Sequence, residues 1–392
     1  MGVVSVASEL SLLPVIDNHC HAVLSSTPIA VDRWRPLFSE SPDPVMRASA
    51  AADTAFYRRL MRELGGFLGV ASDETSVLRA RARLGTDNLV AELFADARIA
   101  GVVIDTGFPA AGEAMDRGQF TSLTGTAYRG LLRLELMFQE LVAATGRYDE
   151  LVPALRRDLA DVRGAGFAGF KSIVGYRTGL DVQQWTDDDA RSAFAAARHE
   201  VEQTGSVRLG HKPLLDTLLH AAFAIAAEQE LPLQFHVGYG DPDVDLRKAG
   251  PLQLRPVLEN PAYRAMPIVL LHGCWPFVRE GAYLASVYGN VHLDLSYAIP
   301  FLSLGELTAM TRAALSVAPF GKLMYSSDGV RVPELHWMGA RTGRRCLATA
   351  LDELVSDGDL DRAEALEVAE RILAGNAAAL YGFGALLPGG AR

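Results

Sequence analysis

Short apolar runs alternate with longer amphipathic segments along most of this chain. Apolar runs bounded by turn residues predict β-strands, and apolar residues three and four positions apart predict helices. The predicted strands are Leu13–Asp17, Ala100–Asp105, Leu131–Leu136, Phe167–Ile173, Leu233–Val237, Ile268–Leu271, Val291–Leu295 and Leu323–Ser326. Helical patterns between and after them include Tyr148–Arg163, Asp188–Gln203, Leu214–Gln229, Pro333–Val355 and Leu360–Leu373.

Eight strands separated by helices predict parallel strands joined by crossover helices. We therefore expect an α/β fold, a (β/α)8 barrel of the TIM type, formed as a single domain over residues 1–392. An open doubly wound sheet is the alternative, but no Gly-x-Gly-x-x-Gly pattern follows the first predicted strand.

The stretch between the first two predicted strands departs from this alternation. Residues 23–98 carry three helical patterns, over Ala52–Phe67, Glu74–Arg83 and Asn88–Arg98. An ordinary connection between a strand and a helix has about two to six residues, so we expect a helical insertion after strand one. The insertion is expected to shape the substrate pocket or to make a dimer contact. A separate small domain is the alternative, although no Gly/Ser-rich linker marks its edges.

The composition narrows the class of protein. Of the 392 residues, 49% are apolar and 21% are charged, which is typical of a globular protein with a large core. The net charge of −10 and the dispersed basic residues argue against nucleic acid or an anionic membrane as a partner. No segment approaches the roughly 20 continuous apolar residues of a membrane span, and the N-terminus does not resemble a signal peptide. Three widely spaced cysteines do not suggest a disulfide framework. We expect a cytoplasmic protein with a small-molecule substrate, and homo-oligomerisation stays open.

Histidines collect at the ends of the predicted strands. The chain has nine histidines, and four of them stand at strand ends, namely His19, His21, His236 and His272; Asp328 follows the last strand. In a barrel of this type the carboxyl ends of the strands form the active site. His19 and His21 share a face because they lie two positions apart on a strand. Imidazole and carboxylate ligands suit a borderline divalent metal. We therefore predict a metal centre for zinc, with manganese or iron as alternatives, and with one or two ions.

The expected chemistry follows from this ligand set. A bound cation lowers the pKa of water to about 7, which supplies a nucleophile at neutral pH. Asp328 is expected to bind the metal and to take the proton of the attacking water. His272 is expected either to bind a second metal or to polarise the carbonyl oxygen of the substrate.

Two further charged side chains belong to the predicted strands. Lys171 on the fourth strand has three interpretations: a carbamylated ligand that bridges two metals, an ammonium group that binds a substrate carboxylate, or an ion pair with Glu135. Glu135 on the third strand is a second candidate for a bridging carboxylate, or it pairs with Arg133 or Lys171. The residue pattern leaves these alternatives open.

The order of the candidate ligands resembles the amidohydrolase superfamily, in its amidohydrolase-related branch. Several strings resemble the FluG-type domain found at the N-terminus of fungal FluG and plant nodulin-type proteins, and alone in bacteria; they are Phe38–Glu40, Phe170–Ile173, Tyr176–Leu180, Phe235–Asp243, Leu271–Phe277, Leu293–Ser296 and Tyr325–Gly329. The resemblance covers residues 14–382. It implies His19, His21, His236 and Asp328 as metal ligands, with His272 catalytic or a ligand to a second metal.

The resemblance also implies a reaction, the hydrolysis of a γ-glutamyl amide to glutamate and an amine. We expect a free-standing hydrolase, because no glutamine synthetase-like ligase domain follows in this sequence. A γ-glutamyl group carries a carboxylate and an ammonium. Arg177, Arg331 and Arg133 are candidates for the carboxylate, since a guanidinium binds it with two hydrogen bonds. Glu40, Asp294 and Asp241 are candidates for the ammonium.

Two other functions fit the same residues. A metal-dependent decarboxylase of an aromatic or related acid would use the same ligands, with an arginine on the departing carboxylate. A non-catalytic partner of a separate glutamine synthetase-like ligase is the third hypothesis, which the full set of candidate ligands disfavours. Product analysis and metal content separate the three.

Overall fold

The computed structural model describes residues 5–27, 30–110 and 112–384. In these residues eight strands form one sheet in chain order. The strands are β1 Val15–Cys20, β2 Ile99–Asp105, β3 Ala127–Arg133, β4 Phe167–Ser172, β5 Leu233–Phe235, β6 Ile268–Leu270, β7 Val291–Ser296 and β8 Leu323–Ser326. Each strand pair with a resolved register is parallel. The ring closes where β8 meets β1, because Asp328 N donates to His19 O at 3.0 Å and His21 N donates to Gly329 O at 2.8 Å. The predicted (β/α)8 barrel is confirmed.

The chain divides into two compact units. The terminal unit comprises Met1–Arg129 and Asp294–Arg392, and the central unit comprises Gly130–Leu293. The prediction of a single domain over the whole chain is not tested by this division and stays a prediction. No helix in the described ranges is both long enough and apolar enough to span a membrane.

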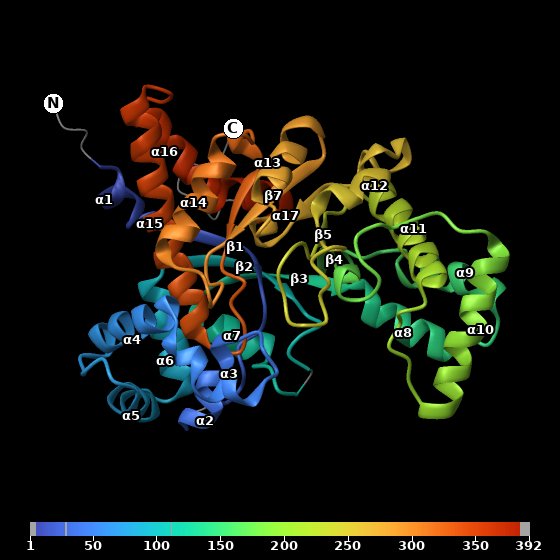
Figure 1. Ribbon diagram of the computed structural model, residues 1–392, viewed down its shortest axis with the longest axis horizontal. Coiled ribbons are helices and arrows are strands. Elements are labelled where there is room, and N and C mark those ends of the chain that lie inside the picture. The colour runs from blue at the N-terminus through green and yellow to red at the C-terminus, as the bar shows by residue number, and fades with distance from the viewer. Residues whose placement is uncertain (1–4, 28–29, 111, 385–392) are drawn as a thin grey trace. The chain divides into compact units, whose positions relative to one another are not determined.

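The terminal unit contains the insertion and the closing helices. Its helices before β3 are α1 Ala7–Leu10, α2 Val31–Trp34, η1 Arg35–Phe38, α3 Pro44–Ala48, η2 Ala50–Asp53, α4 Ala55–Leu68, α5 Glu74–Leu84, α6 Thr86–Asp96 and α7 Arg117–Thr124. Those after β7 are α14 Leu304–Leu315, η7 Phe320–Lys322, α15 Pro333–Asp357, α16 Arg362–Glu370, the π-helical turn η8 Arg371–Gly375 and α17 Asn376–Tyr381. The three long helices predicted in residues 23–98 are present as α4, α5 and α6 (Figure 1).

Local chemistry sets the ends of the insertion helix α4 and of α15. The Thr54 side chain caps α4 by accepting from Tyr57 N, and Gly69 ends it with a φ of 66°. Helix α15 begins with Pro333 in its first turn and ends at Gly358, whose φ is 82°. Sixteen of the residues in α15 are buried, so this helix lies within the terminal unit rather than on its surface.

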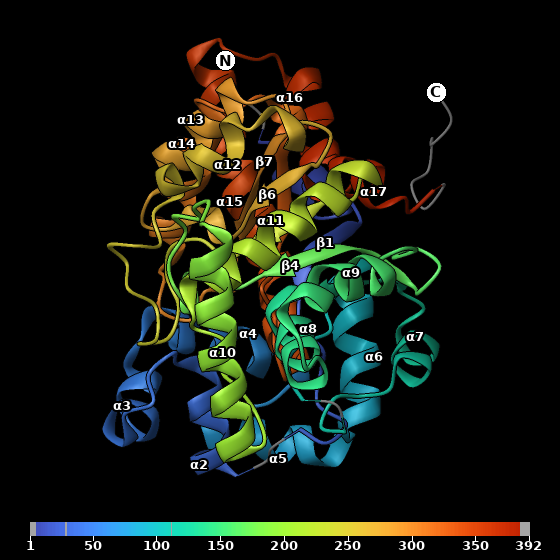
Figure 2. The same ribbon diagram turned by 90° about the vertical axis from the view of Figure 1, so that its right-hand side faces the viewer.

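The central unit carries the middle strands and the helices that follow them. Its helices are α8 Leu134–Ala144, α9 Tyr148–Asp158, η3 Val174–Tyr176, α10 Asp187–Thr204, α11 Lys212–Glu228, η4 Pro251–Leu254, α12 Arg255–Glu259, η5 Pro261–Tyr263, η6 His272–Cys274 and α13 Val278–Val287. Helices α8 to α11 pack on one another (Figure 2). Helices α9, α10 and α11 match the predicted helical patterns.

Several strand boundaries differ from the prediction, and two of the differences concern candidate site residues. Strand β1 continues to Cys20, so His19 lies inside the strand rather than after it. Strand β3 ends at Arg133, and Glu135 therefore lies in the first turn of α8. The run Leu131–Leu136 alternates like a strand, but its Leu134 also begins the buried face of a helix, which continues through Phe138 and Leu141. From Leu134 onward the chain is therefore helical.

Candidate active site

Three of the candidate ligands meet in the terminal unit. His19 Nε2 lies 3.4 Å from Asp328 Oδ1, and His21 Nε2 lies 3.7 Å from the same oxygen. The two imidazole rings stand edge to face with centroids 5.1 Å apart. His19 is fully buried, and 18% of the Asp328 side chain is exposed. The ends of β1 and β8 therefore direct two imidazoles and one carboxylate at a common point.

The backbone around Asp328 is held in an uncommon conformation. Asp328 has a φ of 56°, in the left-handed region that a non-glycine residue seldom adopts. Asp17 fixes the preceding residue, because its two carboxylate oxygens accept from Ser327 N at 2.8 Å and from Ser327 Oγ at 2.5 Å. Ser327 Oγ in turn accepts from Gly329 N at 2.7 Å. These bonds aim the Asp328 carboxylate at the histidines.

A buried histidine that the sequence did not indicate lies near the Asp17 carboxylate. His336 on α15 is 1% exposed, and its Nδ1 lies 3.9 Å from Asp17 Oδ2. Its ring contacts the ring of Phe94 with centroids 5.3 Å apart. Asp17, Cys20 and His336 form a buried group. Burial raises the pKa of the Cys20 thiol, and its Sγ lies 3.7 Å from Val103 O. Asp17 is therefore a positioning residue at the centre of a buried polar group.

Arg331 lies close to the histidine pair in the terminal unit. Its guanidinium carbon stands 4.7 Å from the centroid of the Phe108 ring, and the centroid of the His21 ring lies 5.8 Å from the same centroid. Burial lowers the pKa of Arg331, although the charges of Glu113 and Glu40 oppose this. No described carboxylate lies within ion-pair distance of the Arg331 guanidinium. Glu40 itself lies half-buried after η1 and acts on Arg331 only at longer range.

The central unit brings two other candidates together. His236 Nδ1 lies 2.9 Å from His272 Nε2, and His236 Nε2 lies 2.6 Å from Tyr239 O. His236 is 7% exposed and His272 is 1% exposed. His272 has a φ of 63°. The imidazoles that directly follow β5 and lie just beyond β6 thus contact each other, and their roles as metal ligand and catalytic group stay predictions.

The remaining candidates of the central unit lie around β4. Lys171 is buried on β4, and its backbone is in register with Arg133. Glu135 is fully buried, its Oε1 accepts from Ser172 Oγ at 2.7 Å, and burial raises its pKa. Arg177 is half-buried beyond η3, and no described carboxylate pairs with it. Burial is also the main reason why the pKa of Arg177 is lowered.

A comparison of the sequence with known families agrees with the fold. A family model described as amidohydrolase matches residues 134–383, which contain His236, His272 and Asp328. The chain belongs to the amidohydrolase family. The resemblance stated from the sequence is thereby confirmed, and the protein is an enzyme of a metal-dependent hydrolase superfamily.

Individual relatives of this amidohydrolase agree with that assignment. The protein fluG of Emericella nidulans is 35% identical over 220 residues, which cover 54% of this chain and 25% of fluG. The chain thus spans about a quarter of the curated relative's length. A protein from Lactobacillus casei, described provisionally as a metal-dependent hydrolase, is 27% identical over 99% of this chain and 100% of its own, with a TM-score of 0.88. The uronate isomerase of Thermotoga maritima, 12% identical over 96% of each chain with a TM-score of 0.68, shares the fold.

The residues of this amidohydrolase fit the divalent metal that its family implies. Zinc binds imidazole nitrogen and carboxylate oxygen at about 2.0–2.2 Å, so two such atoms in a tetrahedral site lie roughly 3.3–3.6 Å apart. The separations of 3.4 and 3.7 Å between the Asp328 oxygen and the two histidine nitrogens are close to this range. Two imidazoles and one carboxylate also have the donor chemistry that a borderline metal requires.

Proposed function

We propose that this amidohydrolase cleaves the amide bond of a γ-glutamyl amide, or of a similar small amide with a carboxylate, to give glutamate and an amine. One observation carries the proposal. Arg331 presents a half-buried guanidinium with no carboxylate partner in the described chain, and it lies over the ring of Phe108, which also contacts the ring of His21. Since a buried guanidinium is stabilised by a planar anion, this arrangement favours a substrate that brings a carboxylate to the histidine pair.

The metal would be held by His19, His21 and Asp328, with His236 as the further ligand proposed from the sequence. When bound, a divalent ion polarises the amide carbonyl and lowers the pKa of water. Zinc is the proposed ion. Carbamylation of Lys171, with a second ion, stays a separate proposal. The relative from Lactobacillus casei supports a metal-dependent hydrolase, since the similarity covers almost the whole chain.

The chain's own residues would carry the proton transfers and bind the substrate. Asp328 takes a proton from the attacking water and gives it to the leaving amine nitrogen as the carbon–nitrogen bond breaks. His272 donates a hydrogen bond to the carbonyl oxygen as negative charge develops there. Arg331 binds the α-carboxylate, with Arg177 as the second candidate. Glu40 is proposed for the α-ammonium, and Glu135, which stays buried, is a weaker candidate.

Kinetics of Arg331→Gln test the substrate assignment. We expect the KM for γ-glutamyl amides to rise at least tenfold with kcat changed less, because the lost contact serves binding before the chemical step. Amides of 4-aminobutyrate are the matched control, since they lack the α-carboxylate, and their KM should not change in the variant. An equal loss on both substrates would show that Arg331 does not bind this carboxylate.

The same unpaired guanidinium also suits a decarboxylase, in which it would hold the departing carboxylate. Products separate the two functions, because hydrolysis releases free amine and decarboxylation releases carbon dioxide without amine. A purified protein that binds no divalent metal and cleaves no amide of the panel would instead favour a non-catalytic partner of a ligase.

A further inference from the structure

A cavity of about 470 Å³ lies in the terminal unit, away from the candidate metal ligands. It opens between α4, α14 and α15, with residues of α1 at its edge. Its charged lining consists of four arginines and three carboxylates: Arg59, Arg341, Arg344, Arg345, Glu63, Asp96 and Asp352. The chain as a whole carries a net charge of −10, so an excess of arginine here is a local property of the cavity.

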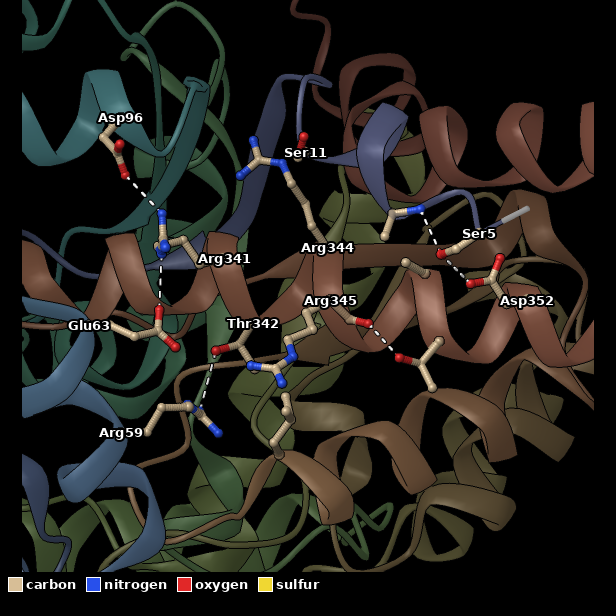
Figure 3. Close-up of a pocket in the computed structure, with 14 residues that line it drawn as sticks. Ser5, Ser11, Arg59, Glu63, Asp96, Arg341, Thr342, Arg344, Arg345 and Asp352 are labelled. Carbon is tan, nitrogen blue, oxygen red and sulfur yellow. Dashed lines mark hydrogen bonds and ion pairs between the residues drawn. The ribbon is translucent and has the colours of Figure 1, made fainter. Parts of the chain in front are cut away.

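The three carboxylates of the cavity are already engaged. Glu63 and Asp96 both accept from Arg341, at 3.0 and 3.3 Å, so that Arg341 bridges them (Figure 3). Asp96 also accepts from the indole of Trp337 at 2.6 Å. Asp352 accepts from Ser5 Oγ at 2.6 Å and from Val6 N at 3.0 Å. Arg341 therefore pairs with Glu63 and Asp96, and Asp352 binds the segment that precedes α1.

Arg59 is left as a buried cation without an ion-pair partner among the described residues. Its residue is 8% exposed, its Nη2 donates to Thr342 Oγ1 at 3.3 Å, and its Nε has no hydrogen-bond partner. No described carboxylate lies within ion-pair distance of it. The Phe56 ring, 5.5 Å from the guanidinium carbon, compensates the charge only weakly. Burial of a charge without a partner is unfavourable, so an anion from outside the described chain would stabilise this guanidinium.

Two neighbouring arginines strengthen the positive field. Arg344 is 7% exposed and, within the described part of the chain, donates to the neutral carbonyl oxygens of Leu13 and Ala97. Arg345 is exposed, has no described carboxylate partner, and its guanidinium lies beside Thr342 on the side of the cavity where Arg59 lies (Figure 3). Burial is the main reason why the pKa of Arg59 is lowered; the charge of Glu63 opposes this, and the like charge of Arg345 lowers the pKa further.

We propose that this cavity binds the phosphate group of a small phosphorylated metabolite, with Arg59 and Arg345 as the binding residues. Guanidinium groups match phosphate oxygens with paired hydrogen bonds, and a doubly charged oxyanion balances two cations. The cavity volume falls in the range of about 300–1,000 Å³ of small-molecule sites, so it admits a phosphate ester as well as free phosphate. This site is independent of the proposed amide hydrolysis.

Titration calorimetry on the full chain tests the proposal, with inorganic phosphate and glycerol 3-phosphate as probes and chloride of equal ionic strength in the reference. We expect saturable binding to the wild type and a rise of its thermal midpoint with phosphate. Tighter binding of glycerol 3-phosphate would identify an ester as the ligand, and tighter binding of phosphate would identify the free ion. No saturable binding of either probe would overturn the proposal.

Three variants locate the binding. Arg59→Met keeps an apolar stem and removes the charge, so we expect no phosphate binding and no loss of thermal midpoint without phosphate. Arg345→Gln should weaken binding at least tenfold. Arg312→Gln is the matched control, since it removes an exposed arginine that is paired with Glu353 in the same unit, and it should bind as the wild type does.

A fourth variant excludes the metal centre as the phosphate site. His19→Asn should bind phosphate with wild-type affinity. Loss of binding in His19→Asn together with full binding in Arg59→Met would place the phosphate at the metal centre and would contradict the proposal.

Discussion

Replacement of Ser327 by alanine should weaken the metal centre without touching a ligand. The Ser327 hydroxyl donates to the buried Asp17 carboxylate at 2.5 Å and accepts from Gly329 N at 2.7 Å. Both bonds hold the segment in which Asp328 adopts a φ of 56°. Alanine removes both bonds, and we expect the Asp328 carboxylate to lose its alignment with the histidines.

The size of the effect follows from the two bonds. A hydrogen bond to a charged group contributes about 1.5–3 kcal/mol, and a buried N–H left without a partner costs about 1–3 kcal/mol. Ser327→Ala should therefore cost roughly 3–5 kcal/mol of folding or metal-binding free energy. Ser326→Ala is the matched control, because the neighbouring serine makes a neutral bond to Ser296 Oγ at 2.9 Å, worth about 0.5–1.5 kcal/mol.

Competition with a chromophoric chelator measures the zinc affinity of both variants, and a thermal scan measures their stability. We expect Ser327→Ala to bind zinc at least tenfold more weakly than Ser326→Ala and to unfold at a lower temperature. Equal zinc affinity and equal thermal midpoints of the two variants would refute the assigned role of the bonds between Asp17 and Ser327.

The remaining predictions concern packing, pH and metal. A Cβ on Gly339 would lie 2.6 Å from Ser327 Cβ and 2.9 Å from its Cα, so Gly339→Ala should lower the thermal midpoint. A Cβ on Gly66 in helix α4 would meet nothing within 4 Å, so Gly66→Ala should raise the thermal midpoint and add up to about 1 kcal/mol to the free energy of unfolding. Hydrogen bonds from Arg35 lower the pKa of Glu74 below its ordinary value of 4.5. The pair therefore stabilises the fold above pH 4.5, and this stabilisation is lost as the pH falls through the lowered pKa of Glu74 in the folded protein. The stability difference between wild type and Glu74→Gln should therefore shrink below pH 4.5, and a constant difference would contradict the pairing. A chelator should lower the thermal midpoint of the wild type, zinc should restore it, and His19→Asn should respond to neither.

The pattern of the sequence was sufficient for the barrel, because strand order follows from the alternation of apolar runs and helices, which is a local property of the chain. Strand periodicity is also local, and the spacing of His19 and His21 predicted a shared face. In the structure both imidazoles lie near the Asp328 carboxylate, although His21 lies just beyond the end of β1. The register and boundaries were less accessible, because the run at Leu131–Leu136 satisfies both periods and only the packing of Phe138 and Leu141 decides for the helix.

The residues that support the site could not be found in this way. His336 lies on helix α15, which has buried residues on most of its faces. The sequence of such a helix does not show which element each face contacts, so the contact of His336 with Asp17 is known only from the structure. Arg59 and Arg331 are of interest because no described carboxylate pairs with either of them. The sequence contains 47 acidic residues, and it does not show which of them lie near a given arginine. Burial and pairing are properties of the tertiary structure.

The central claim is that this amidohydrolase adds water across an amide bond. Mass spectrometry of the products formed from a γ-glutamyl amide in water labelled with oxygen-18 tests it most directly. We expect one labelled oxygen in each glutamate released, one amine for each glutamate, and no product after removal of the metal until zinc is restored. Release of carbon dioxide without amine, or unlabelled glutamate, would contradict it.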